Sequence, residues 1–335
     1  MVRVRFDFLN FDLEEDEFRE RFSTEEACEE MLFQARWPKG FRCPKCGGVQ
    51  AYFIHTRRLY ECTKCYYQAS LTAGTVFENT RTPLTKWFLA IYMMSRLEGI
   101  NAAELHRLIQ VTYKTAWTMM MKLRHVMGLA ENQCLQGSVR FTNTIYGRNR
   151  LTLHSVSKYS VLIAATAEEE CAEKIMMKRL ADQQVGLLRP REIQAIHAKY
   201  FDTSPHHVKY LGIHHHKPFI RQLKSIVLQA QNWIYGTFIA IGEKHLHRYW
   251  DEYVYRYNAE SRYRPILRDY NSVLLRSYGV QPRRWLMHDG KVSGNLFKML
   301  LKHCSTTRTL TYKDIIHTPS IEHIVSVDRG WKTAV

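Results

Sequence analysis

Four cysteines have the spacing that most directly predicts chemistry in this chain. They form two C-x-x-C pairs, Cys43 with Cys46 and Cys62 with Cys65, with 15 residues between the pairs. Each pair presents two thiolates to one ion, and two pairs complete a tetrahedral zinc site with no open position. Two unrelated redox pairs are the alternative, but the separation of the pairs is typical of zinc. The sequence therefore predicts structural zinc in a zinc ribbon over residues 41–80.

A second group of residues lies on a predicted helix that could enter a DNA groove. Residues 81–130 read as a helix from Pro83, a second helix over 102–110 capped by Asn101, a short turn, and a third helix over 113–127 that ends at Gly128. This order predicts a helix-turn-helix, whose last helix meets base edges with its N-terminal residues. Core packing is the alternative for Trp117. The expected DNA-binding residues are Lys114, Thr115, Trp117, Thr118, Lys122 and Arg124.

The charge distribution favours a polyanionic partner. The formal net charge is +16, from 48 basic and 32 acidic residues. Residues 1–39 hold 11 acidic and six basic residues, so the rest of the chain carries +21. Such a surface binds phosphates by releasing counterions, although a basic face can also serve solubility alone. No apolar run is long enough to span a membrane, and we expect a soluble protein that has no membrane partner.

The remaining patterns predict an α+β multidomain chain. Residues 1–40 read as an acidic helical segment with Ser23 as the N-cap of its helix. Strands are expected at 139–141 and 159–164, and helices around 172–180, 190–198 and 219–231. These elements predict an α/β domain over 137–258. Residues 259–335 are expected to form a C-terminal extension of unassigned fold.

Several stretches together resemble a known family. They are Ser23–Cys28, Arg36–Gly47, Leu71–Phe77, Lys86–Phe88 and Tyr113–Trp117. They resemble the N-terminal part of zinc-ribbon DDE transposases of bacterial insertion sequences, which are related to eukaryotic Merlin elements. A weaker similarity continues through Lys244–Tyr249, Asp251–Tyr253 and Arg256–Asn258, and Leu310–Lys313 is similar to the family's tail. The resemblance implies an RNase H-like domain within residues 137–258.

The resemblance also implies three carboxylates that hold two Mg²⁺ ions, and this chain departs from that pattern. Thr142 occupies the first carboxylate's position, and no acidic residue lies between Glu131 and Glu168. Asp202 is the remnant candidate for the second. Lys224 and Ser225 stand where the third belongs. The sequence therefore predicts a degenerate catalytic domain, with Mg²⁺ bound only if activity survives.

Clustered histidines could form a second metal site. They occur at His206-His207 and at His214-His215-His216. Three consecutive histidines cannot all point at one ion from a strand or a helix, so a new metal site is disfavoured. His55, between the cysteine pairs, is expected on the surface rather than as a substitute ligand.

Three hypotheses compete on this evidence. The favoured one is a domesticated, catalytically inactive transposase relative that binds double-stranded DNA, with a homo-oligomer as a further option. The second is an active transposase whose acids are other residues, among them Asp202, Asp182 or Glu192. The third is a non-enzymatic protein-assembly factor. The expected location is the bacterial nucleoid or, in a eukaryote, the nucleus.

Overall fold

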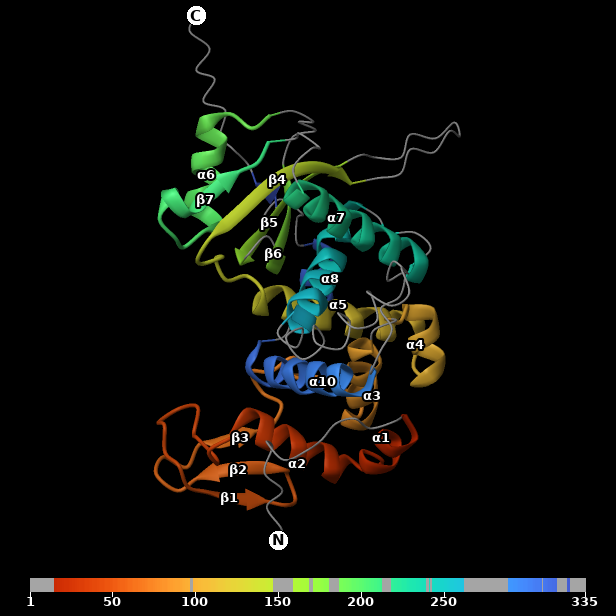
Figure 1. The fold of residues 1–335 in the computed structure, drawn as a ribbon. Helices are drawn as coiled ribbons and strands as arrows, with labels where there is room; N and C mark the ends of the chain where they lie inside the picture. The colour runs from red at the N-terminus through yellow and green to blue at the C-terminus, as the bar shows by residue number, and fades with distance from the viewer. Residues whose placement is uncertain are drawn as a thin grey trace, which may run out of the picture. The chain divides into compact units, whose positions relative to one another are not determined.

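The chain divides into two compact units, each of which is built from two separate segments (Figure 1). Unit 1 comprises Met1–Met127 and Val280–His317, and unit 2 comprises Gly128–Gly279 and Thr318–Val335. The computed structural model describes residues 15–96, 99–146, 159–168, 171–180, 187–212, 218–238, 241, 243–261, 289–308, 310–317 and 324–325. Within these ranges, no helix combines the length and the apolar character that crossing a membrane requires.

The first part of unit 1 is a small sheet that packs on a helix. Strands β1 (Ala51–Ile54), β2 (Leu59–Cys62) and β3 (Gln68–Ser70) pair antiparallel in that order. In register, Phe53, Tyr60 and Ala69 lie side by side. The Tyr60 ring lies 4.9 Å from that of Phe53 and 5.1 Å from that of Phe33. Since Phe33 belongs to α2 (Glu25–Arg36), aromatic contacts join the sheet to this helix.

Two charged residues tie α2 to its neighbours. Near its C-terminus, the Arg36 guanidinium donates hydrogen bonds to the carbonyls of Ser70, the last residue of β3, and of Ala73. At its N-terminus, the Glu25 carboxylate accepts hydrogen bonds from the backbone N–H groups of Leu84 and Thr85, at 3.0 and 2.9 Å. These are the unpaired donors of the first turn of α3 (Leu84–Ser95), so α2 caps the next helix from outside it.

The cap of α2 differs from the sequence prediction. Thr24 is the N-cap, and its hydroxyl accepts a hydrogen bond from Ala27 N–H. Ser23, the predicted cap, instead donates to the Glu20 carbonyl, which lies in the short helix α1 (Glu15–Arg21). Both residues can cap a helix, so the local pattern does not choose between neighbours.

The next helices are α4 (Ala102–Leu108) and α5 (Tyr113–Ala130). Asn101 and Glu104 form a capping box at the start of α4, as the predicted Asn101 cap requires. Helix α5 begins where it was predicted but continues through Gly128. A Cβ at Gly128 would lie 2.6 Å from Asp251 Oδ2. This glycine therefore permits close packing and does not end the helix.

A distant segment completes unit 1. Helix α10 (Asp289–Thr306) packs against α2 and α3, and the short helix α11 (Tyr312–His317) follows it (Figure 1). The Phe297 ring lies 5.2 Å from Phe18, 6.1 Å from Phe22 and 6.1 Å from Phe88. The backbone of Val76 also donates to the Cys304 carbonyl. The core of unit 1 therefore includes part of the predicted C-terminal extension.

Unit 2 is built on a mixed five-stranded sheet. Its strands are β4 (Val139–Tyr146), β5 (Tyr159–Glu168), β6 (Cys171–Leu180), β7 (Val208–Tyr210) and β8 (Ile324–Val325), in the order β7-β4-β5-β6-β8. Strands β4, β5 and β6 form an antiparallel meander. Strand β7 runs parallel to β4, and β8 runs parallel to β6.

The helix predicted around 172–180 is wrong, because this segment is strand β6. It pairs with β5 along most of its length. Ile175, Met176 and Met177 are all buried, so consecutive residues on both faces of the strand are covered. A strand that is buried on both faces loses the polar–apolar alternation that would identify it in a sequence.

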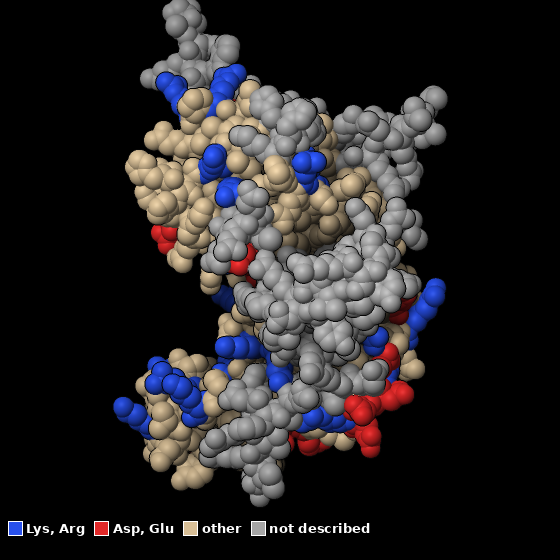
Figure 2. Space-filling view, viewed as in Figure 1, with Lys and Arg blue, Asp and Glu red and all other residues tan. Residues whose placement is uncertain are grey.

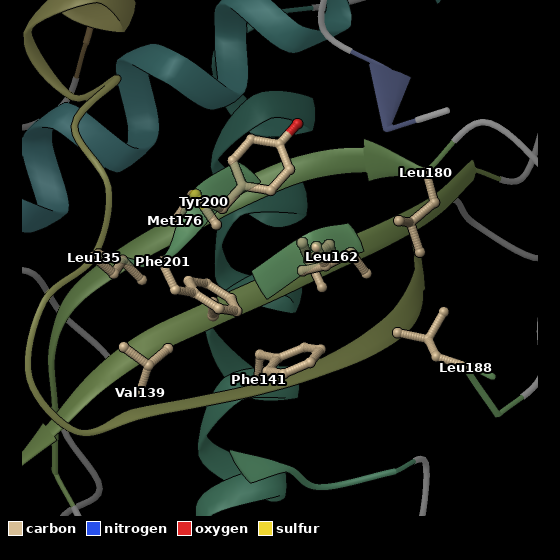
Figure 3. Close-up of a cluster of buried hydrophobic side chains, with 11 residues drawn as sticks. Leu135, Val139, Phe141, Leu162, Met176, Leu180, Leu188, Tyr200 and Phe201 are labelled. Atoms are coloured by element: carbon tan, nitrogen blue, oxygen red, sulfur yellow. The ribbon is translucent and has the colours of Figure 1, made fainter. Parts of the chain in front are cut away.

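Helices cover the sheet of unit 2 and form its main core. Helix α6 (Pro190–Tyr200) packs Ile196 and Tyr200 against alternate residues of β4, Val139 and Phe141, together with Leu162 of β5 (Figure 3). Helix α7 (Pro218–Thr237) packs against β4, β5 and β6, and α8 (Leu246–Ser261) packs against β6. Two 3-10 turns, Pro205–His207 and Glu243–His245, precede β7 and α8.

An asparagine side chain fixes α8 to the sheet. Asn258 Oδ1 accepts a hydrogen bond from Ile175 N–H at 2.7 Å, and its Nδ2 donates to the Ile175 carbonyl at 3.0 Å. The same Nδ2 donates to Glu131 at 2.7 Å. On the same helix, Glu252 forms a buried ion pair at 2.8 Å with Arg256, four residues later. These contacts give a physical account of the Arg256–Asn258 stretch that resembles the transposase family.

Replacing Phe297 tests whether α10 belongs to the core of unit 1. Its side chain is 1% exposed, so Phe297→Ala should lower stability by about 3–5 kcal/mol through lost burial and a cavity. Lys302→Ala, an exposed change on the same helix, is the matched control. Calorimetric unfolding of the zinc-loaded full chain measures both variants. A Phe297→Ala protein that unfolds at the same temperatures as the control would contradict this packing.

Candidate metal centre and nucleic-acid interface

The four predicted cysteines converge in unit 1. Their Sγ atoms all lie within 4.8 Å of one another. The Cys43–Cys65 and Cys46–Cys62 sulfur pairs are each 3.6 Å apart. A tetrahedron of Zn–S bonds of about 2.3 Å places its sulfurs about 3.8 Å apart, so one zinc ion fits this cluster. All four positions of the ion are filled by protein, and the zinc is structural.

The two cysteine turns repeat one backbone pattern. Gly47 N–H donates to the Cys43 carbonyl, and Tyr66 N–H donates to the Cys62 carbonyl, both at 2.9 Å. The donor residue is left-handed in each turn, with φ of 73° at Gly47 and 56° at Tyr66. Glycine adopts this conformation without steric cost, whereas tyrosine is strained there. The first cysteine turn therefore has a residue suited to its left-handed position, whereas the second places a tyrosine in a strained conformation there.

Gly48 is required by proximity rather than by its backbone angle. A Cβ at this position would lie 3.0 Å from Cys62 Sγ and 3.4 Å from Cys46 Sγ. A Cβ at Gly47 would meet nothing within 4 Å. The adjacent glycines thus serve different ends, since Gly47 permits the turn and Gly48 leaves room for the sulfurs.

The sulfurs influence one another's ionisation. Burial opposes ionisation of Cys43, but backbone hydrogen bonds from Cys46 and Lys45 outweigh it and lower the pKa to about 7. At Cys65 a backbone hydrogen bond from Tyr67 favours the thiolate, but the neighbouring thiols raise the pKa to about 12. Four thiolates this close therefore need a bound cation. His55 is exposed, packs edge-on to Phe53, and is not part of the cluster.

The predicted DNA-binding residues divide into two groups along α5. Lys114 is exposed in the first turn. The hydroxyls of Thr112 and Thr115 lie 2.9 Å apart, and Thr112 Oγ1 accepts from Thr115 N–H, so these residues cap the helix. Thr118 donates its hydroxyl to the Lys114 carbonyl. The N-terminal turns thus present Lys114 and the outer sides of two threonines.

The later residues of this set face inward. Lys122 is half-buried with its Nζ 6.0 Å from the Trp87 ring centroid, and burial lowers its pKa. Arg124 is 1% exposed and does not reach the surface in this conformation. Trp117 is half-buried. The aliphatic parts of Lys and Arg side chains can cover apolar surface, which explains how Lys122 and Arg124 occupy the inner side of α5.

Lys114 has a neighbour that no sequence pattern indicated. Its Nζ lies 4.3 Å from the centre of the Tyr312 ring, in α11. The two residues occupy distant parts of the chain, so only the fold brings them together. Figure 2 shows Lys and Arg side chains gathered over the part of the molecule that holds the ribbon, where Lys39, Arg42, Lys45, Arg57, Arg58 and Lys64 are exposed.

The residues at the expected carboxylate positions form hydrogen bonds within the fold. Thr142 is buried on β4, and its hydroxyl donates to the Gly212 carbonyl. Next to it, Asn143 Oδ1 accepts a hydrogen bond from the Tyr210 hydroxyl at 2.8 Å. On α7, Ser225 is exposed and accepts from the Gln229 amide, while Lys224 is half-buried with its pKa lowered by burial.

Asp202 is not the residue that the sheet brings to Thr142. Its N–H donates to the Leu135 carbonyl, ahead of β4, and its exposed carboxylate accepts from Gln136 at 3.0 Å. Because β7 runs parallel to β4, Gly212 is the residue that reaches Thr142. Asp202 therefore bonds to residues that precede β4, whereas Thr142 lies within β4.

The other candidate acids and histidines occupy varied places. Glu192 is buried and accepts from Arg189 N–H at 2.7 Å, where it caps α6. His206 and His207 are exposed on the turn before β7. Asp182 and His214–His216 lie outside the described residues.

Comparison with known proteins supports the ribbon directly. Residues 23–68 match the family model described as the transposase zinc-ribbon domain. A 121-residue stretch is 31% identical to an uncharacterized protein in transposable element ISH50 of Halobacterium salinarum. This match covers 35% of the chain and 40% of the relative, so the chain spans less than half of the curated relative. No solved structure matches the chain. The resemblance to zinc-ribbon insertion-sequence transposases is confirmed.

Substituting the two ribbon glycines separates their roles. Gly48→Ala should weaken zinc retention by about tenfold or more, because its methyl group displaces the sulfurs from tetrahedral geometry. Gly47→Ala is the matched control, since it adds only backbone strain. Chelator competition on the purified zinc protein measures retention. Equal zinc retention in the two variants would refute the spatial role of Gly48.

Proposed function

We propose that this chain, which carries a transposase zinc ribbon, is a DNA-binding protein derived from a transposase and has lost DNA cleavage. One observation carries the catalytic part of the proposal. Neither β4 nor α7, which stand where the first and third carboxylates are expected, contains a single Asp or Glu along its length.

The absence of acids from these elements weakens the case for misplaced ligands. A shift of register within β4 or α7 brings no carboxylate to the centre, because neither element has one to offer. Magnesium takes oxygen ligands, and two-metal cleavage needs negative side chains to hold both ions. Thr142 and Lys224 supply a neutral hydroxyl and an ammonium. A cationic side chain at such a centre repels the metal.

The topology of unit 2 supports an RNase H-like ancestry for this domain. An antiparallel meander of three strands is followed by helix α6 and by a fourth strand parallel to the first. The meander, α6 and β7 lie within the domain implied for residues 137–258, and β8 adds a strand from outside that range. The proposal is that the domain keeps its scaffold and serves DNA binding or assembly without chemistry.

The DNA-binding part of the proposal rests on unit 1. Helices α4 and α5 are joined by a short turn, and the N-terminal turn of α5 exposes Tyr113 and Lys114. A helix of this kind places its first turns in the major groove. The basic ribbon surface adds sequence-independent phosphate contacts. We propose double-stranded DNA as the partner, with association of two or more copies on it, in the nucleoid or the nucleus.

The assembly-factor hypothesis has one observation in its favour. Tyr52 and Tyr66 of the ribbon are 72% and 76% exposed, and exposed aromatic side chains also suit protein contacts. Salt dependence separates the two readings. Binding through phosphates weakens steeply as salt rises, whereas a largely apolar protein contact does not.

Cleavage assays test the loss of catalysis. Zinc-loaded protein incubated with duplex DNA and Mg²⁺ or Mn²⁺ should produce no strand breaks above buffer, because two carboxylate positions are unfilled. Separate replacement of Asp202, Asp182 and Glu192 by Ala should change nothing. Metal-dependent cleavage that one of these substitutions abolishes would establish an active transposase instead.

Removing the Lys114 charge tests the role of α5. Lys114→Ala should weaken binding to a random-sequence duplex and reduce the slope of log K against log salt by about 0.9, the value for one lost phosphate contact. Lys302→Ala, exposed on α10, should leave the slope unchanged. Fluorescence anisotropy across a salt series measures both. An unaltered slope in Lys114→Ala would remove this end of α5 from the interface.

A further inference from the structure

Helix α11 returns to the N-terminal end of α5. The two elements are separated along the chain by most of unit 2, yet Lys114 Nζ lies 4.3 Å from the Tyr312 ring centroid. This distance is within the range in which an ammonium is attracted to an aromatic face. The contact lies at the end of α5 that is expected to meet bases.

The position of Lys114 is electrostatically unusual. It lies in the first turn of α5, where the positive end of the helix dipole disfavours a cation. Lys86 adds a second ammonium nearby, since its Nζ donates to the Gln110 carbonyl just before α5. The Tyr312 ring offsets part of this disadvantage at Lys114. An anion bound at this end would offset more of it.

Helix α11 presents further exposed groups at this place. Ile315 is 1% exposed and anchors the helix, whereas Tyr312 and Lys313 are exposed. The acidic residue of the helix, Asp314, accepts hydrogen bonds from the N–H and hydroxyl of Thr311, both at 2.7 Å. These bonds lower its pKa, as does the nearby charge of Arg308. Asp314 and Thr311 therefore cap the start of α11 reciprocally, and Arg308 and Lys313 leave the segment basic.

We propose that α11 and the first turn of α5 form one DNA-contact surface. Lys313 binds a backbone phosphate, and Tyr312 acts as a positioning residue that holds the Lys114 ammonium toward the groove. The partner is duplex DNA, recognised by its phosphates at Lys313 and by groove contacts at Lys114. This inference rests on the proposed DNA-binding function and extends it to a segment outside the helix-turn-helix.

Salt-dependent binding tests the role of Lys313. Zinc-loaded full-length protein is titrated against a labelled random-sequence duplex by fluorescence anisotropy at several salt concentrations. Lys313→Ala should reduce the slope of log K against log salt by about 0.9, whereas the control Lys302→Ala should not. The same slope in both variants would overturn the phosphate contact.

A double-mutant comparison tests the positioning role of Tyr312. Tyr312→Ala should weaken binding several-fold, and Tyr312→Phe should bind like the unchanged protein because it keeps the ring. Adding Tyr312→Ala to Lys114→Ala should cause no further loss, since Tyr312 acts through Lys114. An independent, additive loss would overturn the positioning role. Tighter binding by Tyr312→Ala would overturn the proposal by showing that α11 covers the interface.

The outcomes separate this inference from the proposed function. If Lys114→Ala weakens binding while Tyr312→Ala and Lys313→Ala do not, the inference fails and the proposed function stands. If the protein does not bind duplex DNA, both fail. Zinc content and circular dichroism of each variant confirm that folding is retained.

Discussion

The clustering of four thiolates around one cation is the constraint on which unit 1 depends. The three ribbon strands have only three or four residues each, too few to be stable without a cross-link or a core of their own. Once the sulfurs are fixed, Tyr60 can pack on α2, and Arg36 can donate to the Ser70 carbonyl at the end of β3. Helix α2 in turn caps α3 through Glu25. The metal's influence therefore reaches the helices through a series of direct contacts.

In unit 2, the residues at and beside the first expected carboxylate position form hydrogen bonds within the fold. Thr142 and Asn143 face opposite sides of β4 and hydrogen-bond to Gly212 and Tyr210, respectively. These bonds satisfy polar groups in a buried strand, as burial demands. A carboxylate at Thr142 without a metal would leave an uncompensated charge. A neutral residue at position 142 is thus physically compatible with this fold, which the Asn258 and Glu252–Arg256 contacts also stabilise.

Local chemistry was readable from the sequence, and long-range assembly was not. The cysteine spacing predicted the sulfur cluster, and Asn101 predicted the start of α4, because a turn and a cap each involve residues a few positions apart. Strand β6 was mistaken for a helix because its two covered faces hide the alternation. The contacts of Phe297 and Tyr312 depend on partners far away along the chain. Arg124 was expected at the DNA surface, although its burial follows from the inner face of α5.

Unit 1 is built from two segments that are far apart in the chain, and this order affects how it folds during synthesis. Its core lacks Phe297 until the ribosome has synthesised Gly128–Gly279, the first segment of unit 2, so unit 1 cannot finish folding early in translation. A chain truncated within Gly128–Gly279 would lose α10, and with it part of the core of unit 1. Truncation in the middle of the chain therefore cannot readily leave a complete, folded unit 1, and any function that unit 1 carries depends on synthesis of the intervening segment as well.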